Sequence, residues 1–370
     1  MLQRLYAHNF RCLENFEFKP DGATSALLIG RNGSGKSTVA RVLQVLQRIG
    51  RGVNRVGQLV RPGEFTLGRS DAPMRFELDV VLGPSRFEYG LALDLPPGFR
   101  QLRVLEETLS VNGMPVFTRR EAEVTLHRNL SGKAEVVFPV DWHLVALPVI
   151  QDRALADPLN TFRQWLERMA ILSPVPRLMQ GNASGETLAP NDDGSNFADW
   201  MTGVLAQYPA SYSDISAHLQ EVMPDLSLFK NLSAGRDAKS LVVEFKSDEG
   251  KVALPFDDLS DGEKCFFLCA LVLAAAKAYG PIFVFWDEPD NYLAMPEVGH
   301  FVVALRRAFD SGGQLVISSH NAEAIRSFSD NNTWVLNRKS HLEPTVVRAL
   351  SDFHIEGGLI QAILSGELLA

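Results

Sequence analysis

The pattern of apolar and polar positions changes several times along the chain. Residues 26–30 form a short apolar run that predicts a strand, and a glycine-rich turn follows it. From Ser37 to Gly50 apolar residues recur at helical spacing, so we expect a helix that ends at this glycine. From about residue 74 to 140 short alternating runs are broken by Gly and Pro, which predicts an antiparallel meander.

The remainder of the chain first has helical and then mixed periodicity. From about Pro158 to Met223 the segments FRQWLERMAIL, FADWMTGVLAQY and DISAHLQEVM predict helices, and SLVVEF then predicts a strand. After these come a helix from about Asp261, the strand IFVFW, a helix near 299–309, and the strands QLVIS and TWVLN. Helices that alternate with wholly apolar strands indicate a parallel sheet that helices cover on both faces.

Composition limits the class of protein. The 370 residues are 46% hydrophobic and 22% charged, as in globular chains that bury a large core. Three cysteines, Cys12, Cys265 and Cys269, form neither a disulfide framework nor a zinc-ligand pattern, which favours a reducing, cytoplasmic compartment. The longest apolar run, from Cys265 to Ala276, is too short to span a membrane, and we find no signal-peptide core.

Charge is distributed unevenly. The net charge is -8, yet residues 1–70 hold eleven Lys or Arg against four Asp or Glu. The basic side chains beyond the glycine-rich turn are Arg41, Arg48, Arg51, Arg55, Arg61 and Arg69. This segment is either a solvated face or a surface for an anion or nucleic acid, and the sequence leaves both interpretations open.

The glycine-rich turn matches the phosphate-loop pattern GxxxxGK[ST] between a predicted strand and a predicted helix. Glycines let backbone N–H groups turn toward phosphates, the lysine reaches the β- and γ-phosphates, and the hydroxyl after it binds Mg²⁺. The expected nucleotide-binding residues are Gly30, Arg31, Asn32, Gly33, Ser34, Gly35, Lys36, Ser37 and Thr38.

Two carboxylates, Asp287 and Glu288, follow the predicted strand IFVFW. The carboxyl ends of parallel strands are where ligands gather in such sheets. Asp287 is therefore a candidate for the Mg²⁺ shell, and Glu288 is a candidate to polarise an attacking water. On their own the two residues fit a cap of the following turn equally well.

The segment LSDGEK, residues 259–264, begins the predicted helix CFFLCALVLAAA. Ser260 and Glu263 have the spacing of a capping box, with which any helix could begin. The segment is also similar to the LSGGQ signature of ABC ATPases. Asp261 and Lys264 depart from that signature.

The order GRNGSGKS, LSDGEK, FVFWDEPDNYLAMP and VISSHN resembles ABC-type ATPases, in particular the SMC/RecF/OLD branch. NFRCLENFEF before the phosphate loop and DEPDNYLAMP both point to that branch, although Ala294 stands where it often has His. The resemblance implies an α/β fold: an ABC-type P-loop NTPase head with a mostly parallel sheet flanked by helices, an antiparallel β subregion and a helical insertion. The parts would be an N-terminal ATPase lobe at 1–150, the insertion at 151–235, and a C-terminal lobe at 236–370.

The same resemblance implies residue roles. Lys36 and Ser37 would bind MgATP, with Asp287 in the metal shell, Glu288 as catalytic carboxylate and His320 as the switch residue that senses the γ-phosphate. Gln151 would be the Q-loop glutamine, near both nucleotide and metal. Ser260 and Gly262 would meet the γ-phosphate of a second protomer, with residues 290–293 lining that interface. Arg11 would touch phosphate or a partner, or else form a surface salt bridge.

We therefore expect an ATP hydrolase that binds ATP and Mg²⁺ and forms a homodimer through ATP. No nuclease cluster follows His320, so a nuclease activity would belong to another protein. The first hypothesis is a switch that binds DNA or RNA and licenses a separate effector in bacterial defence or repair. The alternative is an assembly scaffold or regulator that works only through protein partners, and the apolar stretch at 358–370 favours such docking if it is not packed on the chain's own core.

Overall fold

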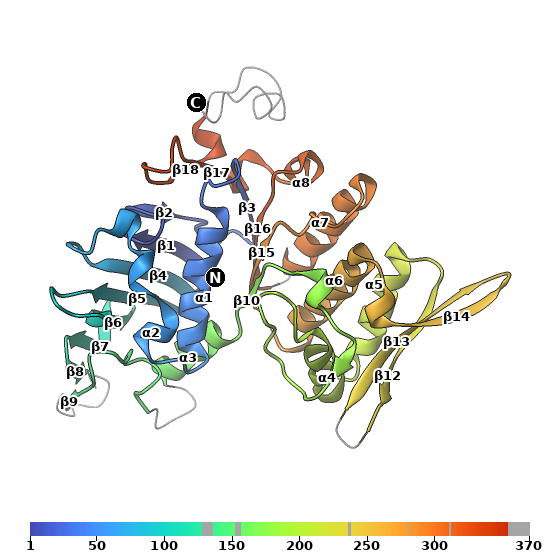
Figure 1. Cartoon of the computed structure of the whole chain (residues 1–370), viewed down its shortest axis with the longest axis horizontal. Coiled ribbons are helices and arrows are strands. Elements are labelled where there is room, and N and C mark those ends of the chain that lie inside the picture. Colours follow the sequence, from blue (N-terminus) through green and yellow to red (C-terminus); the bar gives the residue numbers. More distant parts are fainter. Residues whose placement is uncertain (128–135, 152–156, 236–237, 281, 311, 354–370) are drawn as a thin grey trace. The chain divides into compact units, whose positions relative to one another are not determined.

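The computed structural model describes the chain apart from residues 128–135, 152–156, 236–237, 281, 311 and 354–370 (Figure 1). Its contacts form two compact units. Unit 1 consists of Met1–Met169 and Asp330–Ala370, and unit 2 consists of Ala170–Ser329. The expected division at residues 150 and 235 stays a prediction, and the apolar stretch at 358–370 lies outside the described residues.

An antiparallel sheet of the order β2-β1-β4-β5-β6-β7-β8-β9 forms much of unit 1. Alternate side chains of its strands are buried, and Asn112 and Gly113, with φ of 52° and 77°, make the two-residue turn between β6 and β7. This confirms the meander predicted for 74–140. The strands are β1 (Leu2–His8), β2 (Phe16–Phe18), β4 (Met74–Leu82), β5 (Ser85–Asp94), β6 (Arg103–Val111), β7 (Met114–Arg120), β8 (Glu123–Leu126) and β9 (Val136–Pro139).

Unit 1 also contains the strand that leads into the phosphate loop. This strand, β3 (Ser25–Ile29), is parallel to β17 (Thr333–Asn337), and β17 is antiparallel to β18 (Val346–Ala349). The helices of the unit are α1 (Lys36–Gly50), α2 (Val56–Leu59) and α3 (Pro158–Glu167).

Helix α1 packs on α3, as Figure 1 shows, through the apolar positions that the periodicity identified. A Cβ added to Gly50 would lie 2.5 Å from Leu166 Cβ, so the glycine allows the close approach of the two helices. Gln47 Nε2 also donates to the carbonyl of Met169 at 2.6 Å.

Three parallel strands form the centre of unit 2: β10 (Ala170–Leu172), β15 (Phe283–Asp287) and β16 (Gln314–Ser318). They are apolar along almost their whole length, as strands covered on both faces are. The helices are α4 (Phe197–Gln207), α5 (Ser211–Val222), α6 (Asp261–Ala278), α7 (Met295–Asp310) and α8 (Ala322–Arg326), and the outer antiparallel strands are β11 (Asn182–Ala183), β12 (Leu226–Ser233), β13 (Lys239–Ser247) and β14 (Gly250–Pro255).

One predicted element is wrong in type. FRQWLERMAIL reads as one helix, but α3 ends at Glu167 and residues 170–172 form strand β10. Parallel pairing with β15 gives this short buried run hydrogen-bond partners for its backbone on one side. Otherwise the α/β class is confirmed.

Among the described residues, none of the helices combines the length and apolarity needed to cross a membrane.

Candidate functional site

The phosphate loop connects β3 to α1 in unit 1. Gly33 and Gly35 have φ of 79° and 106°, a region that favours glycine. Gly35 is the N-cap of α1, and the first turn holds no acidic residue, so the positive end of the helix dipole is not neutralised locally. Such a helix terminus is suited to bind an anion.

Lys36 is buried and folds back over the loop. Its ammonium donates to the carbonyl of Gly30 at 2.9 Å and lies 3.5 Å from the carbonyl of Arg31. Ser34 Oγ is buried without a hydrogen-bond partner among the described residues. Much of the loop is open to solvent: Arg31, Asn32, Gly33 and Ser37 are exposed, Gly30 and Thr38 are half-buried, and Gly35 is buried.

A brace from elsewhere in unit 1 holds the loop. Thr345 Oγ1 donates to the carbonyl of Ser34 at 2.8 Å, and its backbone N–H donates to Cys12 at 2.8 Å. Cys12 Sγ in turn lies 3.5 Å from Thr38 Oγ1. A Cβ on Gly35 would lie 2.8 Å from Thr345 Oγ1, so glycine is needed for the close contact as well as for φ. Sequence reasoning missed Thr345, which is 311 positions from Ser34.

Two further sequence candidates lie in unit 1 away from these contacts. Gln151 is exposed, and within the described chain no hydrogen bond joins it to the phosphate loop. Arg11 makes two hydrogen bonds to Glu64 Oε1, at 2.9 and 2.6 Å. This is the surface salt bridge that the sequence offered as one interpretation of Arg11.

The two carboxylates of unit 2 lie at the carboxyl end of β15. Asp287 ends the strand and pairs in register with Ser318 of β16. The hydroxyl of Ser318 donates to the Asp287 carboxylate, and the same oxygen accepts the backbone N–H of Glu288 at 3.1 Å. Ser318 therefore fixes the direction in which both acidic residues leave the strand.

Glu288 lies beside His320. The carboxylate oxygen Oε1 is 3.4 Å from His320 Nδ1, and Oε2 accepts a hydrogen bond from Asn291 Nδ2 at 2.8 Å. The Glu288 backbone has φ of 50°, a left-handed conformation that is uncommon for a residue with a side chain. About a quarter of the Glu288 side chain and about half of the His320 side chain are exposed, so solvent reaches the pair.

The loop after Glu288 contains a buried acid. Asp290 is 5% exposed, and burial raises the pKa of its carboxyl, although Ser319 donates a hydrogen bond that opposes the shift. The Oδ1 atom of Asp290 has no hydrogen-bond partner within the described residues. A buried acceptor left in this way costs free energy unless another group binds it.

Gly262 lies against this loop, two residues after Ser260. Ser260 caps α6: its Oγ accepts the N–H of Glu263 at 3.3 Å, and Glu263 accepts the N–H of Ser260 at 2.7 Å. The capping box is therefore present. A Cβ added to Gly262 would lie 3.0 Å from the carbonyl of Tyr292, so the start of α6 and the 290–293 loop are in close contact.

The structure thus forms two groups of candidate residues. Unit 1 holds the phosphate loop, and unit 2 brings Asp287, Glu288 and His320 together beside the start of α6. Within the described part of the chain no three His, Cys, Asp or Glu side chains form a metal cage. The oxygen donors of Ser37 and Asp287 nevertheless suit Mg²⁺, which in nucleotide sites takes few protein ligands and completes its shell with phosphate and water.

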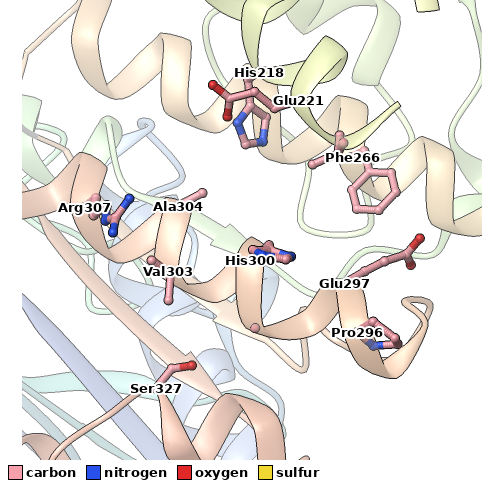
Figure 2. A pocket seen from close by; sticks show the side chains of 12 residues that line it. His218, Glu221, Phe266, Pro296, Glu297, His300, Val303, Ala304, Arg307 and Ser327 are labelled. Atoms are coloured by element: carbon pink, nitrogen blue, oxygen red, sulfur yellow. The ribbon is translucent and has the colours of Figure 1, made fainter. Parts of the chain in front are cut away.

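A hollow of about 620 Å³ in unit 2 lies apart from these residues (Figure 2). Its wall is largely apolar, with Phe266, Val303 and Ala304 among the lining residues. Figure 2 shows His218 of α5 directed toward it. Burial lowers the pKa of His218, and among the described residues its Nε2 has no hydrogen-bond partner. None of the residues with a predicted role in ATP chemistry lines this hollow.

Comparison with known proteins yields one family and several solved structures. The model of a family described as "AAA domain, putative AbiEii toxin, Type IV TA system" matches residues 25–133 and 148–326. No curated protein matches the sequence.

Two of the solved structures are heads of Smc proteins. One is a crystal structure of an SmcHead bound to the C-winged helix domain of ScpA, with a TM-score of 0.57 and 14% identity over 95% of this chain and 99% of that one. The other is an Smc head domain with an extended coiled coil, bound to the C-terminal domain of ScpA and derived from Pyrococcus furiosus, with a TM-score of 0.51 and 13% identity over 99% of each chain. At this identity the likeness shows the fold, and it confirms the predicted class, an ABC-type P-loop NTPase head.

Proposed function

Because the chain belongs to the AAA-domain family described as a putative AbiEii toxin of a Type IV TA system, we propose that it is an ATP-hydrolysing switch. In this proposal it dimerises around ATP, binds nucleic acid and licenses a separate effector protein. The observation that carries the proposal is the phosphate loop, in which Lys36 is buried over glycines of positive φ at the start of α1.

The nucleotide would bind at this loop. Backbone N–H groups from Gly30 to Thr38 and the ammonium of Lys36 would hold the phosphates, and the unpartnered Ser34 Oγ would gain a partner there. Ser37, Asp287 and Gln151 would be the residues that bind Mg²⁺, and Gln151 would also contact the nucleotide. Mg²⁺, when bound, neutralises charge that develops on the phosphate oxygens.

Hydrolysis would use Glu288 and His320. Glu288 would orient a water for attack on the γ-phosphorus and accept its proton, while the bond from the γ-phosphorus to the β,γ-bridging oxygen breaks and ADP leaves. A carboxylate in partial contact with solvent is suited to this role. His320, 3.4 Å from that carboxylate, would sense whether the γ-phosphate is present. The hydrogen bonds of Asn291 and Ser318 would keep Glu288 in position.

The dimer would complete each site. Ser260 and Gly262 would meet the γ-phosphate bound by a second copy, and the 290–293 loop would line the interface. The close packing of Gly262 on the carbonyl of Tyr292 supports this, because the two segments would then present one continuous surface. Two-fold symmetry gives two such sites in each dimer.

Several observations support the link to nucleic acid and to an effector. The excess of positive charge in residues 1–70 suits a polyanion, and the family description names a putative toxin of a Type IV TA system. A role in bacterial defence or repair is part of the proposal. We also propose that the chain belongs to the SMC/RecF/OLD branch and is located in the cytoplasm.

A second candidate function is a scaffold that acts only through protein partners. It is favoured by the two Smc heads, both of which are described as bound to domains of ScpA.

Two substitutions test the core of the proposal. Lys36→Ala removes the ammonium that opposes the β- and γ-phosphates, so we expect ATP affinity measured by calorimetry to fall at least about tenfold. Glu288→Gln keeps the size of the side chain, so ATP binding should persist while turnover falls by about 10²- to 10⁴-fold. Lys251→Ala, at an exposed position of β14, is the matched control for loss of a lysine. Unchanged ATP affinity in Lys36→Ala would reject the nucleotide site.

A further inference from the structure

Unit 1 contains a hollow of about 680 Å³ that the proposed ATP chemistry does not use. Three segments contribute lining residues: 55–62 around α2, 100–102 just before β6, and 141–144 after β9. These segments are distant in sequence but converge on one surface of the same unit.

Three arginines in this hollow are exposed: Arg55, Arg61 and Arg100. Among the described residues, none of the three guanidinium groups forms an ion pair with a carboxylate. Like charges that line one hollow repel one another, and a bound anion relieves that repulsion.

Other arginines of the same basic segment differ. Arg48 donates to the carbonyl of Gln58 at 2.9 Å, Arg51 lies 3.3 Å from the carbonyl of Glu167, and Arg69 pairs with Glu14. The structure therefore separates arginines that bind other parts of the fold from exposed arginines that form no ion pair among the described residues. The sequence predicts a nucleic-acid surface along Arg48, Arg51, Arg55, Arg61 and Arg69. Of these five residues only Arg55 and Arg61 line the hollow, together with Arg100, which the sequence did not suggest.

The one carboxylate that lines the hollow, Asp141, is already engaged. It accepts hydrogen bonds from the backbone N–H of His143 at 2.8 Å and from His143 Nδ1 at 3.2 Å. The hydrogen bond from the backbone lowers the pKa of Asp141, so this residue stays charged and offsets part of the arginine charge. The hollow keeps an excess of positive charge.

Two exposed aromatic rings adjoin the arginines. Phe99 precedes Arg100, and Trp142 follows Asp141; the ring centroids are 6.4 Å apart. Phe99 is 47% exposed and Trp142 is 41% exposed, although large aromatic side chains usually lie inside. Arg103 lies over the Trp142 ring at 5.4 Å, held in place by Asp94.

The surface is held rigid from within. Buried Glu107 accepts the backbone N–H groups of Ala146 and Leu147 at 2.6 and 2.9 Å, and buried Arg119 donates to the carbonyl of Asp141 at 2.9 Å. The N–H of Val104 donates to the carbonyl of Trp142 at 2.7 Å. A site fixed in this way loses little conformational entropy when it binds.

We propose that this arginine and aromatic surface binds single-stranded nucleic acid, with phosphates on Arg55, Arg61 and Arg100 and unstacked bases on Trp142 and Phe99. Exposed rings beside a positively charged hollow fit a strand whose bases are free to stack, whereas a duplex keeps its base faces covered. The inference deepens the proposed function and rests on its nucleic-acid link.

The test is fluorescence anisotropy with the full chain and labelled oligonucleotides of about 15 nucleotides, the upper range for one such binding site. The probes are oligothymidine, oligouridine and a duplex of mixed sequence, each with and without ATP. We expect both single strands to bind more tightly than the duplex. The thymidine and uridine arms separate DNA from RNA as the preferred strand.

Substitutions then test each part of the surface. Trp142→Ala should weaken binding by roughly 5- to 150-fold, the range for one stacked base, and Trp142→Phe should recover part of that loss. Replacing Arg55, Arg61 and Arg100 by Ala should reduce the slope of log affinity against log salt by about 2, since each phosphate contact on a single strand contributes roughly 0.7. Arg86→Ala removes an exposed arginine of the same unit that does not line the hollow; it is the control and should leave affinity within about twofold.

The outcomes are distinguishable from failure of the proposed function. Equal binding by the triple variant and the parent chain, no single-strand binding at low salt, or duplex binding that Trp142→Ala leaves unchanged would each overturn this surface. ATP binding and hydrolysis in the same variants report separately on the phosphate loop. Loss of ATP binding in the parent chain would instead overturn the proposed ATP switch.

Discussion

Glu288 shows at the scale of one residue how a catalytic candidate can be held in a costly conformation. A non-glycine residue at a φ of 50° costs on the order of 1–3 kcal/mol, and it persists only where neighbours fix it. Here the Glu288 backbone N–H contacts both the carbonyl and the hydroxyl of Ser318, and Asn291 holds its carboxylate. In this conformation the carboxylate lies 3.4 Å from His320 Nδ1.

Thr345 allows a prediction about the phosphate loop. Thr345→Val keeps the shape of the side chain but removes the hydroxyl that donates to the carbonyl of Ser34. A buried acceptor left unsatisfied costs about 1–3 kcal/mol, so we expect ATP affinity to fall by roughly 5- to 150-fold if the loop relaxes away from its binding conformation. Calorimetry measures the affinity, and Thr345→Ser, which keeps the hydroxyl, is the matched control. Equal affinities in the Val and Ser variants would contradict the brace.

Sequence reasoning found the phosphate loop because its residue types follow from local chemistry. Glycine, lysine and serine at that spacing between a strand and a helix leave few alternatives. Thr345, Ser318 and Asn291 could not be found in the same way, because each acts through a contact that only the folded chain creates. The roles predicted for Ser260, Gly262, Gln151 and His320 stay predictions, since they depend on a ligand or a second copy.

At the scale of elements, pairing partners decide what local periodicity cannot. The segment at 170–172 is three apolar residues long, a length at which helix and strand patterns are the same. It becomes a strand because β15 offers a parallel neighbour. Longer elements were predictable. Helix α1 and strands β16 and β17 have the extents expected from the apolar pattern, because each has enough buried apolar residues in sequence to distinguish a helix from a strand.

Glu107 of β6 and Arg119 of β7 form a buried pair. Both side chains also bind the backbone of residues 141–147: Glu107 accepts the N–H groups of Ala146 and Leu147, and Arg119 donates to the carbonyl of Asp141. Both side chains are fully buried, 3.7 Å apart, and burial raises the pKa of Glu107 and lowers the pKa of Arg119. Desolvation therefore outweighs attraction for both groups, and the hydrogen bonds around them carry the stability.

Removing one member of this pair should destabilise unit 1 strongly. Glu107→Ala removes the counter-ion of buried Arg119 and leaves the Tyr89 hydroxyl and two backbone N–H groups without their acceptor. We therefore expect the free energy of unfolding to fall by about 3–5 kcal/mol. Urea denaturation followed by tryptophan fluorescence measures it. Glu88→Ala on β5, whose carboxylate pairs with exposed Arg86, should cost at most about 1 kcal/mol. A similar cost in the two variants would show that the buried network contributes little.

At the scale of the whole chain, each compact unit collects segments that the sequence separates. Residues from 330 onward belong to unit 1, where β17 pairs with β3 across some 300 positions. The apolar pattern predicted both strands but not their pairing, because a strand's neighbour is chosen by the complete topology. The basic balance of residues 1–70 was visible in composition, while the division of its arginines into bonded and unpaired groups required the structure.

The last prediction concerns assembly and the composite sites. Ser260→Arg places a large cation where the partner's γ-phosphate would meet Ser260, but it leaves the phosphate loop intact. Lys36→Ala has the opposite defect. Each variant alone should lack ATPase activity. In a mixed dimer, the loop of the first chain and the signature of the second form one working site.

Random pairing of equal amounts makes half of the dimers mixed, each with one working site of two, so the mixture should recover about a quarter of the parent activity. Ser260 also caps α6, and loss of a cap costs about 1 kcal/mol. Glu263→Ala is therefore the control: it removes the other half of the capping box, keeps the Ser260 hydroxyl and should leave ATPase activity largely intact. If mixed dimers verified by two different tags recover no activity, the two chains do not share a site, and each chain hydrolyses ATP without its neighbour or not at all.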